Sequence, residues 1–430
     1  MSTQWFEATL NDVCHRITDG AHASPKSVDR GLPMASVKDM SAYGLNLETA
    51  RHISAEDFAT LVRQGCKPLV GDVLIAKDGA TALDTVCVIQ RPIEVVLLSS
   101  VAILRPKTDV VQPEFLRYYL DAESTRTYMK AAFTTGAAIP RVVLKDFKRA
   151  RIRYPDLASQ TRICAALSAY DDLIENNVRR MSILEEMARR IYEEWFVRFR
   201  FPGHEGVRMV ESELGLVPEG WRIGTVAEVA VVYRGRSYKG TELADFGGRP
   251  FVNLKCMERD GGFRASGLKR YTGQFKESHT VRPGDMVMGI TDMTQERRIV
   301  ARVGRVSGLD ADFGVFSMDL VRIASRGQYA EPYLYAMFRW SGFADEVKQH
   351  ANGANVLHLL PARIEEFAFA RPTPELAARF ADLFAPMLSL CDKLERKNAN
   401  LQAARDLLLP KLISGELDVS AMSEPEAIAA

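Results

Sequence analysis

The feature that most constrains this fold is a long stretch with the spacing of a helix that pairs with another helix. Residues 157–196 contain no glycine or proline, and their core positions recur at alternating steps of four and three residues. Such a pattern, kept over several heptads, predicts a coiled-coil helix. The core positions are Ile163, Leu167, Tyr170, Ile174, Asn177, Met181, Leu184, Ala188, Ile191 and Trp195.

A second helix with the same spacing is expected near the C-terminus. Thr373 and Pro374 are typical of a helix start, and Gly415 is typical of a helix end. The first helix is expected to begin at its candidate cap, Asp156, and to end before Pro202. The core positions of the second helix are Phe380, Phe384, Met387, Cys391, Leu394, Asn398, Leu401, Arg405, Leu408 and Leu412.

The two helices are expected to pair in antiparallel fashion. One register joins three pairs across the seam: Ile163 with Leu412, Asn177 with Asn398, and Trp195 with Phe380. A polar asparagine at a core position commonly fixes the register of a coiled coil, so we predict that the two asparagines meet. The alternative is that both asparagines face solvent at the edge of the seam. Helices of this length would span about 60 Å.

The rest of the chain contains a repeat of about 215 residues. GDVLIAKDG at 71–79 corresponds to GDMVMGITD at 284–292, and GAAIPRVVL at 136–144 corresponds to GANVLHLLP at 353–361. In each repeat, apolar β-branched runs predict strands and amphipathic segments predict helices. The expected fold class is α+β, with two similar α/β modules separated by the pair of long antiparallel helices and related by pseudo-two-fold symmetry.

These patterns divide the chain into six expected segments. They are a first module at 1–155, a helix at 156–202, a linker at 203–216, a second module at 217–372, a helix at 373–415 and a disordered tail at 416–430.

Composition and charge narrow the class of protein. Apolar residues make up 47% and charged residues 26% of the chain, which is ordinary for a soluble globular protein. Without a run of about 18 apolar residues, no membrane span is expected. The six cysteines are scattered, which favours free thiols, a reducing cytoplasmic setting and no metal site. The net charge of +1 indicates no partner by itself, although the modules are mildly basic and the helical parts mildly acidic.

Several phrases resemble one known family, the specificity subunits of type I restriction–modification systems. They are a Trp near the start of each module (Trp5 and Trp221), the GDVLIA segment, SQTRICAALSAYDDLIE at 159–175 and LLLPKLISGELDV at 407–419. The resemblance covers residues 1–419. The second helix departs from the pattern, because ELAARF at 375–380 lacks the Gln of SQTRI. The resemblance implies that the helical regions are also the docking surfaces for the modification subunits, and whether the two surfaces are equivalent is left open.

The resemblance implies a DNA-binding subunit without catalytic activity. Each module would recognise one half of an asymmetric bipartite target, and the helices would set the gap between the halves. The expected partners are double-stranded DNA, two copies of a modification (methyltransferase) subunit, and restriction (translocase and nuclease) subunits that join through the complex. S-adenosylmethionine, ATP and magnesium are expected on those partner subunits and not on this chain. The sequence also lacks the P-loop and the H-E-x-x-H metal motif.

Residues that contact DNA are expected in polar, glycine-bearing loops, because their side chains suit phosphates and base edges. A single Lys or Arg in such a loop is more often only solvated, so the loops as sets carry the prediction. The first-module candidates are Lys38, Lys77, Asp78, Thr81 and Arg141. The second-module candidates are Arg234, Arg236, Lys239, Lys255, Gln295, Arg297 and Arg298, of which the last three form the densest polar group.

Two other functions stay open at this point. A stand-alone DNA-binding regulator could use the helices to space two half-site readers, although the ending LPKLISGEL favours a docked subunit. An enzyme with an unrecognised site in one module is the other alternative. The duplication argues against an enzyme, because no polar catalytic set recurs in the two repeats.

Overall fold

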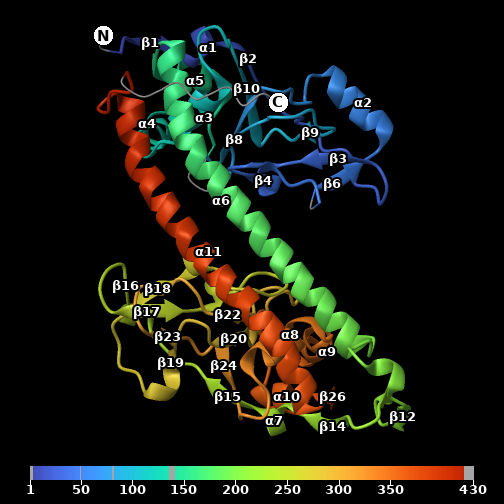
Figure 1. The fold of residues 1–430 in the computed structure, drawn as a ribbon. Coiled ribbons are helices and arrows are strands. Elements are labelled where there is room, and N and C mark those ends of the chain that lie inside the picture. The colour runs from blue at the N-terminus through green and yellow to red at the C-terminus, as the bar shows by residue number, and fades with distance from the viewer. Residues whose placement is uncertain (1–2, 49, 80–81, 135–140, 421–430) are drawn as a thin grey trace. The chain divides into compact units, whose positions relative to one another are not determined.

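The computed structural model describes residues 3–48, 50–79, 82–134 and 141–420 (Figure 1). The chain divides into two compact units. Unit 1 comprises residues 1–176 and 398–430, and unit 2 comprises residues 177–397. Each unit therefore contains one module together with a segment of each long helix.

The long helices lie where their sequence spacing predicted them. Helix α6 spans Leu157–Tyr192 and continues as a π-helix, η2, over Glu193–Val197. Helix α11 spans Pro374–Ser414. At the start of α6 the Asp156 carboxylate accepts a hydrogen bond from the Ser159 amide at 2.9 Å, so the predicted cap is present.

Unit 1 holds the first module. Its helices are α1 (Leu10–Val13), α2 (Ala55–Arg63), α3 (Pro113–Asp121), α4 (Glu123–Phe133) and α5 (Leu144–Arg149). Its strands are β1 (Trp5–Thr9), β2 (Cys14–Asp19), β3 (Leu32–Ala35), β4 (Met40–Ser41), β5 (Gly44–Leu45), β6 (Arg51–Ile53), β7 (Val73–Ala76), β8 (Val86–Val88), β9 (Val96–Leu97), β10 (Val101–Pro106) and β11 (Arg151–Pro155).

Unit 2 holds the second module. Its helices are α7 (Val226–Val229), α8 (Glu331–Trp340), α9 (Phe343–Val347) and α10 (Pro361–Glu365). Its strands are β12 (Met209–Ser212), β13 (Gly215–Pro218), β14 (Arg222–Thr225), β15 (Ala230–Arg234), β16 (Leu243–Ala244), β17 (Arg249–Val252), β18 (Lys269–Tyr271), β19 (Thr280–Val281), β20 (Met286–Gly289), β21 (Thr291–Asp292), β22 (Val303–Arg305), β23 (Gly314–Phe316), β24 (Leu320–Ser325), β25 (Leu357–His358) and β26 (Ala368–Arg371).

The two modules share one topology. A four-stranded antiparallel sheet has the order β2-β10-β7-β8 in unit 1 and β15-β24-β20-β22 in unit 2. The first and last strands of each module also pair, as β1 with β11 and β14 with β26. A second sheet contains the parallel pair β3 and β9 in unit 1, and β17 and β23 in unit 2. The α+β fold class with two similar modules and two long helices is therefore confirmed.

Each module completes its hydrophobic core with the helix segments of its own unit. In unit 1, Ile163 and Leu167 of α6 and Leu412 of α11 are buried with residues from the first module. In unit 2, Trp195 and Phe380 form the predicted seam pair, with ring centroids 6.2 Å apart. Burial of such large apolar side chains makes the paired helix segments part of each core.

The two asparagines of the seam are buried, which excludes the alternative that they face solvent. Within unit 1 the Asn398 side-chain amide donates a hydrogen bond to the carbonyl of Ile174 at 3.4 Å. Asn177 belongs to unit 2. The predicted pairing of Asn177 with Asn398 stays a prediction.

Residues from several of the phrases behind the resemblance are buried in unit 1. Gln160 is completely buried, accepts a hydrogen bond from the Gln112 amide at 2.8 Å and donates to the Pro155 carbonyl at 2.8 Å. Gly415 has a φ of 79°, and a Cβ there would lie 2.7 Å from the Trp5 ring. Gln160 is therefore not available as a docking residue, and its absence from the second helix does not bear on docking.

Two of the expected segments differ from the structure. Residues 416–420 were expected in a disordered tail, yet Val419 is buried in the core of unit 1, so the expectation was wrong there. Residues 421–430 lie outside the described part of the chain. The expected linker at 203–216 contains β12 and the start of β13, which pair as an antiparallel hairpin. The remaining domain boundaries stay predictions.

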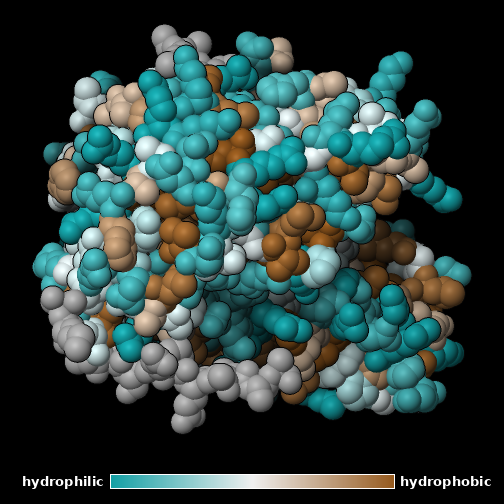
Figure 2. Space-filling view, turned by 90° about the horizontal axis from the view of Figure 1, so that it is seen from above, coloured by the Kyte–Doolittle hydropathy of each residue, from teal (hydrophilic) through white to brown (hydrophobic). Residues whose placement is uncertain are grey.

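The surface turned to the viewer in Figure 2 is mainly hydrophilic, with hydrophobic residues in small separate patches. Across the described residues, no helix is both long enough and apolar enough to cross a membrane. The long helices are amphipathic, as paired helices require.

A buried ion network joins the module of unit 1 to both of its helix segments. The carboxylate of Asp171 on α6 accepts hydrogen bonds from Arg117 at 2.7 Å, from the Tyr118 hydroxyl at 2.8 Å and from Arg405 at 2.6 Å. Burial by itself would raise the pKa of Asp171. The charge of Arg117 and the hydrogen bonds from the three partners outweigh burial and hold that pKa below its ordinary value.

We predict that Asp171→Ala lowers the free energy of unfolding of the full chain by about 3–5 kcal/mol, because two arginines would lose their buried counter-charge. Asp172→Ala is the matched control, since Asp172 is the exposed neighbour on the same helix. Urea unfolding followed by circular dichroism would measure both. Equal stability of the two variants would contradict the structural role of the network.

Candidate nucleic-acid interface

The same turn occurs after the same strand in both modules. Leu83 has a φ of 69°, and its amide donates to the carbonyl of Ala76, the last residue of β7, at 2.7 Å. Ala301 has a φ of 61°, and its amide donates to Gly289, the last residue of β20, at 2.8 Å. Positive φ is uncommon and strained for residues other than glycine, so its recurrence shows that the same turn is present in both repeats.

This turn closes one polar loop in each module, which we call the reading loops. The first reading loop comprises residues 77–82 and the second comprises residues 290–300. The second loop is the longer of the two, so the repeats differ in length within a shared frame. Candidate residues Lys77, Asp78 and Thr81 belong to the first loop, although residues 80–81, including Thr81, lie outside the described residues.

The described residues of the repeated motif at 136–144 and 353–361 lie beside the start of the reading loop in each module. Arg141 forms a β-bridge with Asp78 in unit 1, and His358 of β25 pairs with Thr291 of β21 in unit 2. The GAAIPRVVL and GANVLHLLP motifs are thus equivalent in space as well as in sequence. A strand end, a reading loop and a returning segment therefore form the candidate site in each module.

In the first module, the candidates at this site are joined by ion pairs in which positive and negative side chains alternate. The Lys77 ammonium is buried, 3.3 Å from an oxygen of Asp19 and 3.6 Å from an oxygen of Asp78. Asp78 also accepts a hydrogen bond from the Arg141 Nε at 3.0 Å. Because Lys77 is buried and paired, the structure gives it a positioning role and argues against the predicted direct contact with DNA. Arg141 is exposed.

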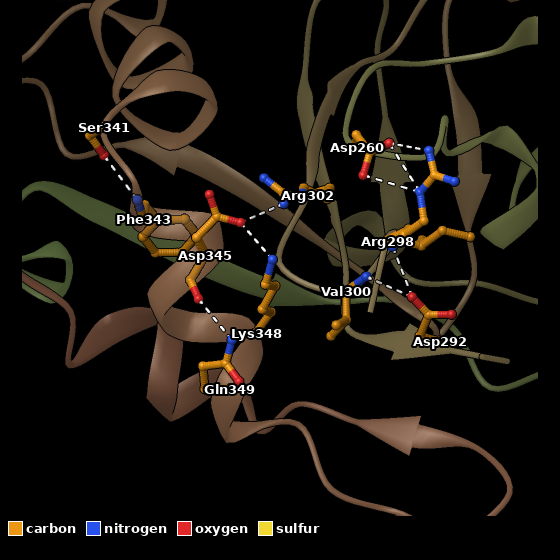
Figure 3. Close-up of polar contacts among 11 residues, drawn as sticks. Asp260, Asp292, Arg298, Val300, Arg302, Ser341, Phe343, Asp345, Lys348 and Gln349 are labelled. Atoms are coloured by element: carbon orange, nitrogen blue, oxygen red, sulfur yellow. Dashed lines mark hydrogen bonds and ion pairs between the residues drawn. The ribbon is translucent and has the colours of Figure 1, made fainter. Parts of the chain in front are cut away.

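In the second module, one buried carboxylate organises the reading loop. Asp292 is 1% exposed and accepts hydrogen bonds from the Thr294 amide at 2.9 Å and the Ile299 amide at 2.8 Å. The Val300 amide also donates to this carboxylate, at 3.4 Å (Figure 3). An acceptor that binds several loop amides fixes the loop backbone, as Asx turns do.

Three neighbouring candidates, Gln295, Arg297 and Arg298, lie on this loop. The Gln295 amide nitrogen donates to the Ala354 carbonyl at 3.1 Å, and Arg297 Nη1 donates to the Gln349 side-chain oxygen at 2.9 Å. Arg298 pairs with Asp260, with its Nε 3.1 Å from a carboxylate oxygen (Figure 3). The loop therefore presents polar side chains whose positions are fixed by neighbours within unit 2.

Arg298 lowers the pKa of Asp260 below its ordinary value, first through its hydrogen bonds and then through its charge. A carboxylate with a lowered pKa keeps its charge at neutral pH. The Arg298–Asp260 pair is therefore formed at neutral pH and is lost only as the pH falls through this lowered value.

The remaining candidates lie elsewhere in their modules. Lys38, Arg234, Lys239 and Lys255 are exposed, and Arg236 is half-buried with its Nε 3.1 Å from the Gln274 carbonyl. Within the described part of the chain, none of these five forms a hydrogen bond or an ion pair with a reading loop. Whether any of the candidates touches DNA stays a prediction.

Sequence reasoning missed the aspartates that support the candidates. Asp19, Asp260 and Asp292 hold Lys77, Arg298 and the loop backbone, respectively. For Asp292 a local signal existed, because an Asp two residues before a Thr is typical of an Asx turn. For Asp19 and Asp260 the partners are distant in sequence, so no local pattern could identify them.

The described residues contain no cluster of three or more side chains suited to hold a metal ion. All six cysteines are free thiols. Burial raises the pKa of Cys14 and Cys87 to about 12, and that of Cys256 and Cys391 to about 11. Thiols with such pKa values are poor nucleophiles and poor metal ligands at neutral pH.

We predict that Asp292→Ala loosens the second reading loop, because several amides would lose their acceptor at once. Amide exchange in a peptide covering 292–300, measured by mass spectrometry, should become at least about tenfold faster. Asp312→Ala, at an exposed position of the same module, is the control and should leave this peptide unchanged. Unchanged exchange in Asp292→Ala would show that the carboxylate does not organise the loop.

Comparison with known proteins shows which proteins the chain resembles. Residues 4–185 match the model of the Type I restriction modification DNA specificity domain. The type I restriction enzyme MjaIX specificity subunit of Methanocaldococcus jannaschii is 25% identical over 322 residues, which cover 73% of this chain and 71% of that protein. The MjaVIII specificity subunit of the same organism is 26% identical over 216 residues, which cover 50% of this chain and 47% of that protein.

A solved structure shows the same fold. The S subunit of a type I restriction–modification system from M. genitalium aligns with a TM-score of 0.54 at 13% identity, over 95% of this chain and 96% of that one. The predicted resemblance is thus confirmed: residues 4–185 match the DNA specificity domain, and the chain is similar to the specificity subunits of type I restriction–modification systems.

Proposed function

We propose that the chain recognises an asymmetric bipartite DNA target, with one half-site for each module and a gap set by the long helices. The observation that carries this proposal is the pair of reading loops. Both loops are closed by the same left-handed turn, yet they differ in length and in side chains. A constant frame with divergent loops is expected where two readers share one task and differ in target.

We further propose that the chain is not catalytic and directs partner methyltransferase and restriction subunits to its target. The similarity of the chain to specificity subunits supports this proposal. S-adenosylmethionine, ATP and magnesium would bind to the two modification subunits and the restriction subunits of a DNA-bound complex.

The stand-alone regulator is the alternative, and the ending LPKLISGEL no longer argues against it. Leu412, Ile413 and Gly415 of this phrase lie in the core of unit 1 or against Trp5, so folding alone accounts for them. Co-purification of the full chain with a modification subunit would support the docked subunit. Isolation of a chain that binds its target DNA without such a partner would support the regulator.

We predict that methylation mapping in the host finds one target with two specified half-sites and a fixed, unspecified gap. Deletion of the gene for this chain should abolish that methylation and leave other methylated motifs unchanged. Sequencing that detects modified bases makes the measurement. A single contiguous palindrome assigned to this chain would contradict the model of two different readers.

A further inference from the structure

Two arginines at the candidate sites, one in each module, are held by an aspartate in the same way. Arg141 Nε and Nη2 lie 3.0 and 3.4 Å from the two oxygens of Asp78. Arg298 Nε lies 3.1 Å from an oxygen of Asp260, and its Nη2 binds that same oxygen (Figure 3). In both pairs the carboxylate occupies the Nε side of the guanidinium.

Both guanidinium groups are accessible to a large partner. The side chains of Arg141 and Arg298 are 58% and 42% exposed. Arg105 has the same side-on pairing with Asp72, but it is less exposed, at 30%. Arg270 and Arg305 instead use both Nη atoms for their aspartates.

The backbone also pins each pair. The amide of Asp260 donates to the carbonyl of Arg298 at 2.7 Å, and the residues Asp78 and Arg141 form a β-bridge. Asp260 adopts a φ of 66°, the strained left-handed region for a residue other than glycine. Such strain persists where surrounding contacts hold a residue in place, which is common at functional sites.

A side-on aspartate takes up Nε and one hydrogen of Nη2. The end edge of the guanidinium, formed by Nη1 and the second hydrogen of Nη2, then points away from the carboxylate. Two parallel donors on that edge match the N7 and O6 acceptors of guanine in the major groove. A planar guanidinium that is already oriented loses less entropy when it binds. The neighbouring carboxylate also offsets the arginine charge, which weakens attraction to a phosphate and favours a neutral base edge.

We propose that Arg298 reads a guanine in the half-site of the second module, and that Asp260 is its positioning residue. This inference rests on the proposed function and adds to it a base and a reader for that module. The half-site read by the second module should therefore contain at least one specified G·C pair. Exchange of that pair should be sensed by Arg298.

The test uses the full chain in complex with its modification subunits and a library of duplexes that varies every target position. Arg298→Ala should reduce discrimination at one G·C position by about tenfold or more and leave the other half-site unchanged. Asp260→Asn should relax the position read by Arg298 in part, because the arginine stays but its orientation is no longer fixed.

Arg208→Ala is the matched control, because Arg208 is an exposed arginine paired with Glu219 in the β12–β13 hairpin, outside both reading loops. It should leave every target position unchanged. Circular dichroism of each variant would show that the chain remains folded.

The possible results distinguish a failure of guanine reading from a failure of the proposed DNA recognition. Uniform weakening on all duplexes, with a salt dependence reduced by about one phosphate contact, would assign the arginine to the backbone and overturn guanine reading. Unchanged discrimination at every position in a folded Arg298→Ala complex would overturn it as well. If the unmodified complex prefers no duplex in the library, the proposed function itself fails.

Discussion

The structure depends on the pairing of helix segments that lie far apart in the chain, one in its middle and one near its C-terminus. The core of unit 1 needs Ile163 and Leu167 from α6 together with Leu412 from α11. The core of unit 2 needs Trp195 and Phe380 from the same two helices. Neither module buries its apolar residues with its own sequence alone, so the helices are structural parts of both units and more than connections between them.

This constraint explains why the framework is repeated while the reading loops differ. Strand ends, left-handed turns and returning segments recur in both modules because each is tied to a sheet and a core. Ile290 and Val300 anchor the two ends of the second reading loop in that core. Residues 293–298 between them are not part of it, so they tolerate insertion and change. Their backbone is nonetheless fixed by Asp292, which gives a variable loop the rigidity that recognition requires.

Much of the architecture could be predicted from sequence because it rests on periodic patterns. The heptad spacing predicted both long helices and the Trp195–Phe380 contact, and the repeat predicted two similar modules. Features that depend on distant partners could not be predicted. Lys77 looked like an exposed loop cation until its burial against Asp19 was seen, and Gln160 looked like a surface motif residue.

The candidate site was predictable only in part, for the same physical reason. Polar loop composition pointed to Arg141 and Arg298, but the orientation of a guanidinium is set by the carboxylate beside it. Asp260 lies far from Arg298 in sequence, and no propensity or spacing rule joins the two. Sequence therefore identified the groups that could contact DNA, while geometry identified how two of them are held.

The central claim is that the reading loops contact DNA, and amide exchange in the assembled complex tests it most directly. Exchange would be compared with and without a duplex that carries the mapped target. We expect slower amide exchange in peptides covering 290–300 and 141–144 when the duplex is bound. Protection confined to other segments, such as the β12–β13 hairpin at 209–218, would contradict it.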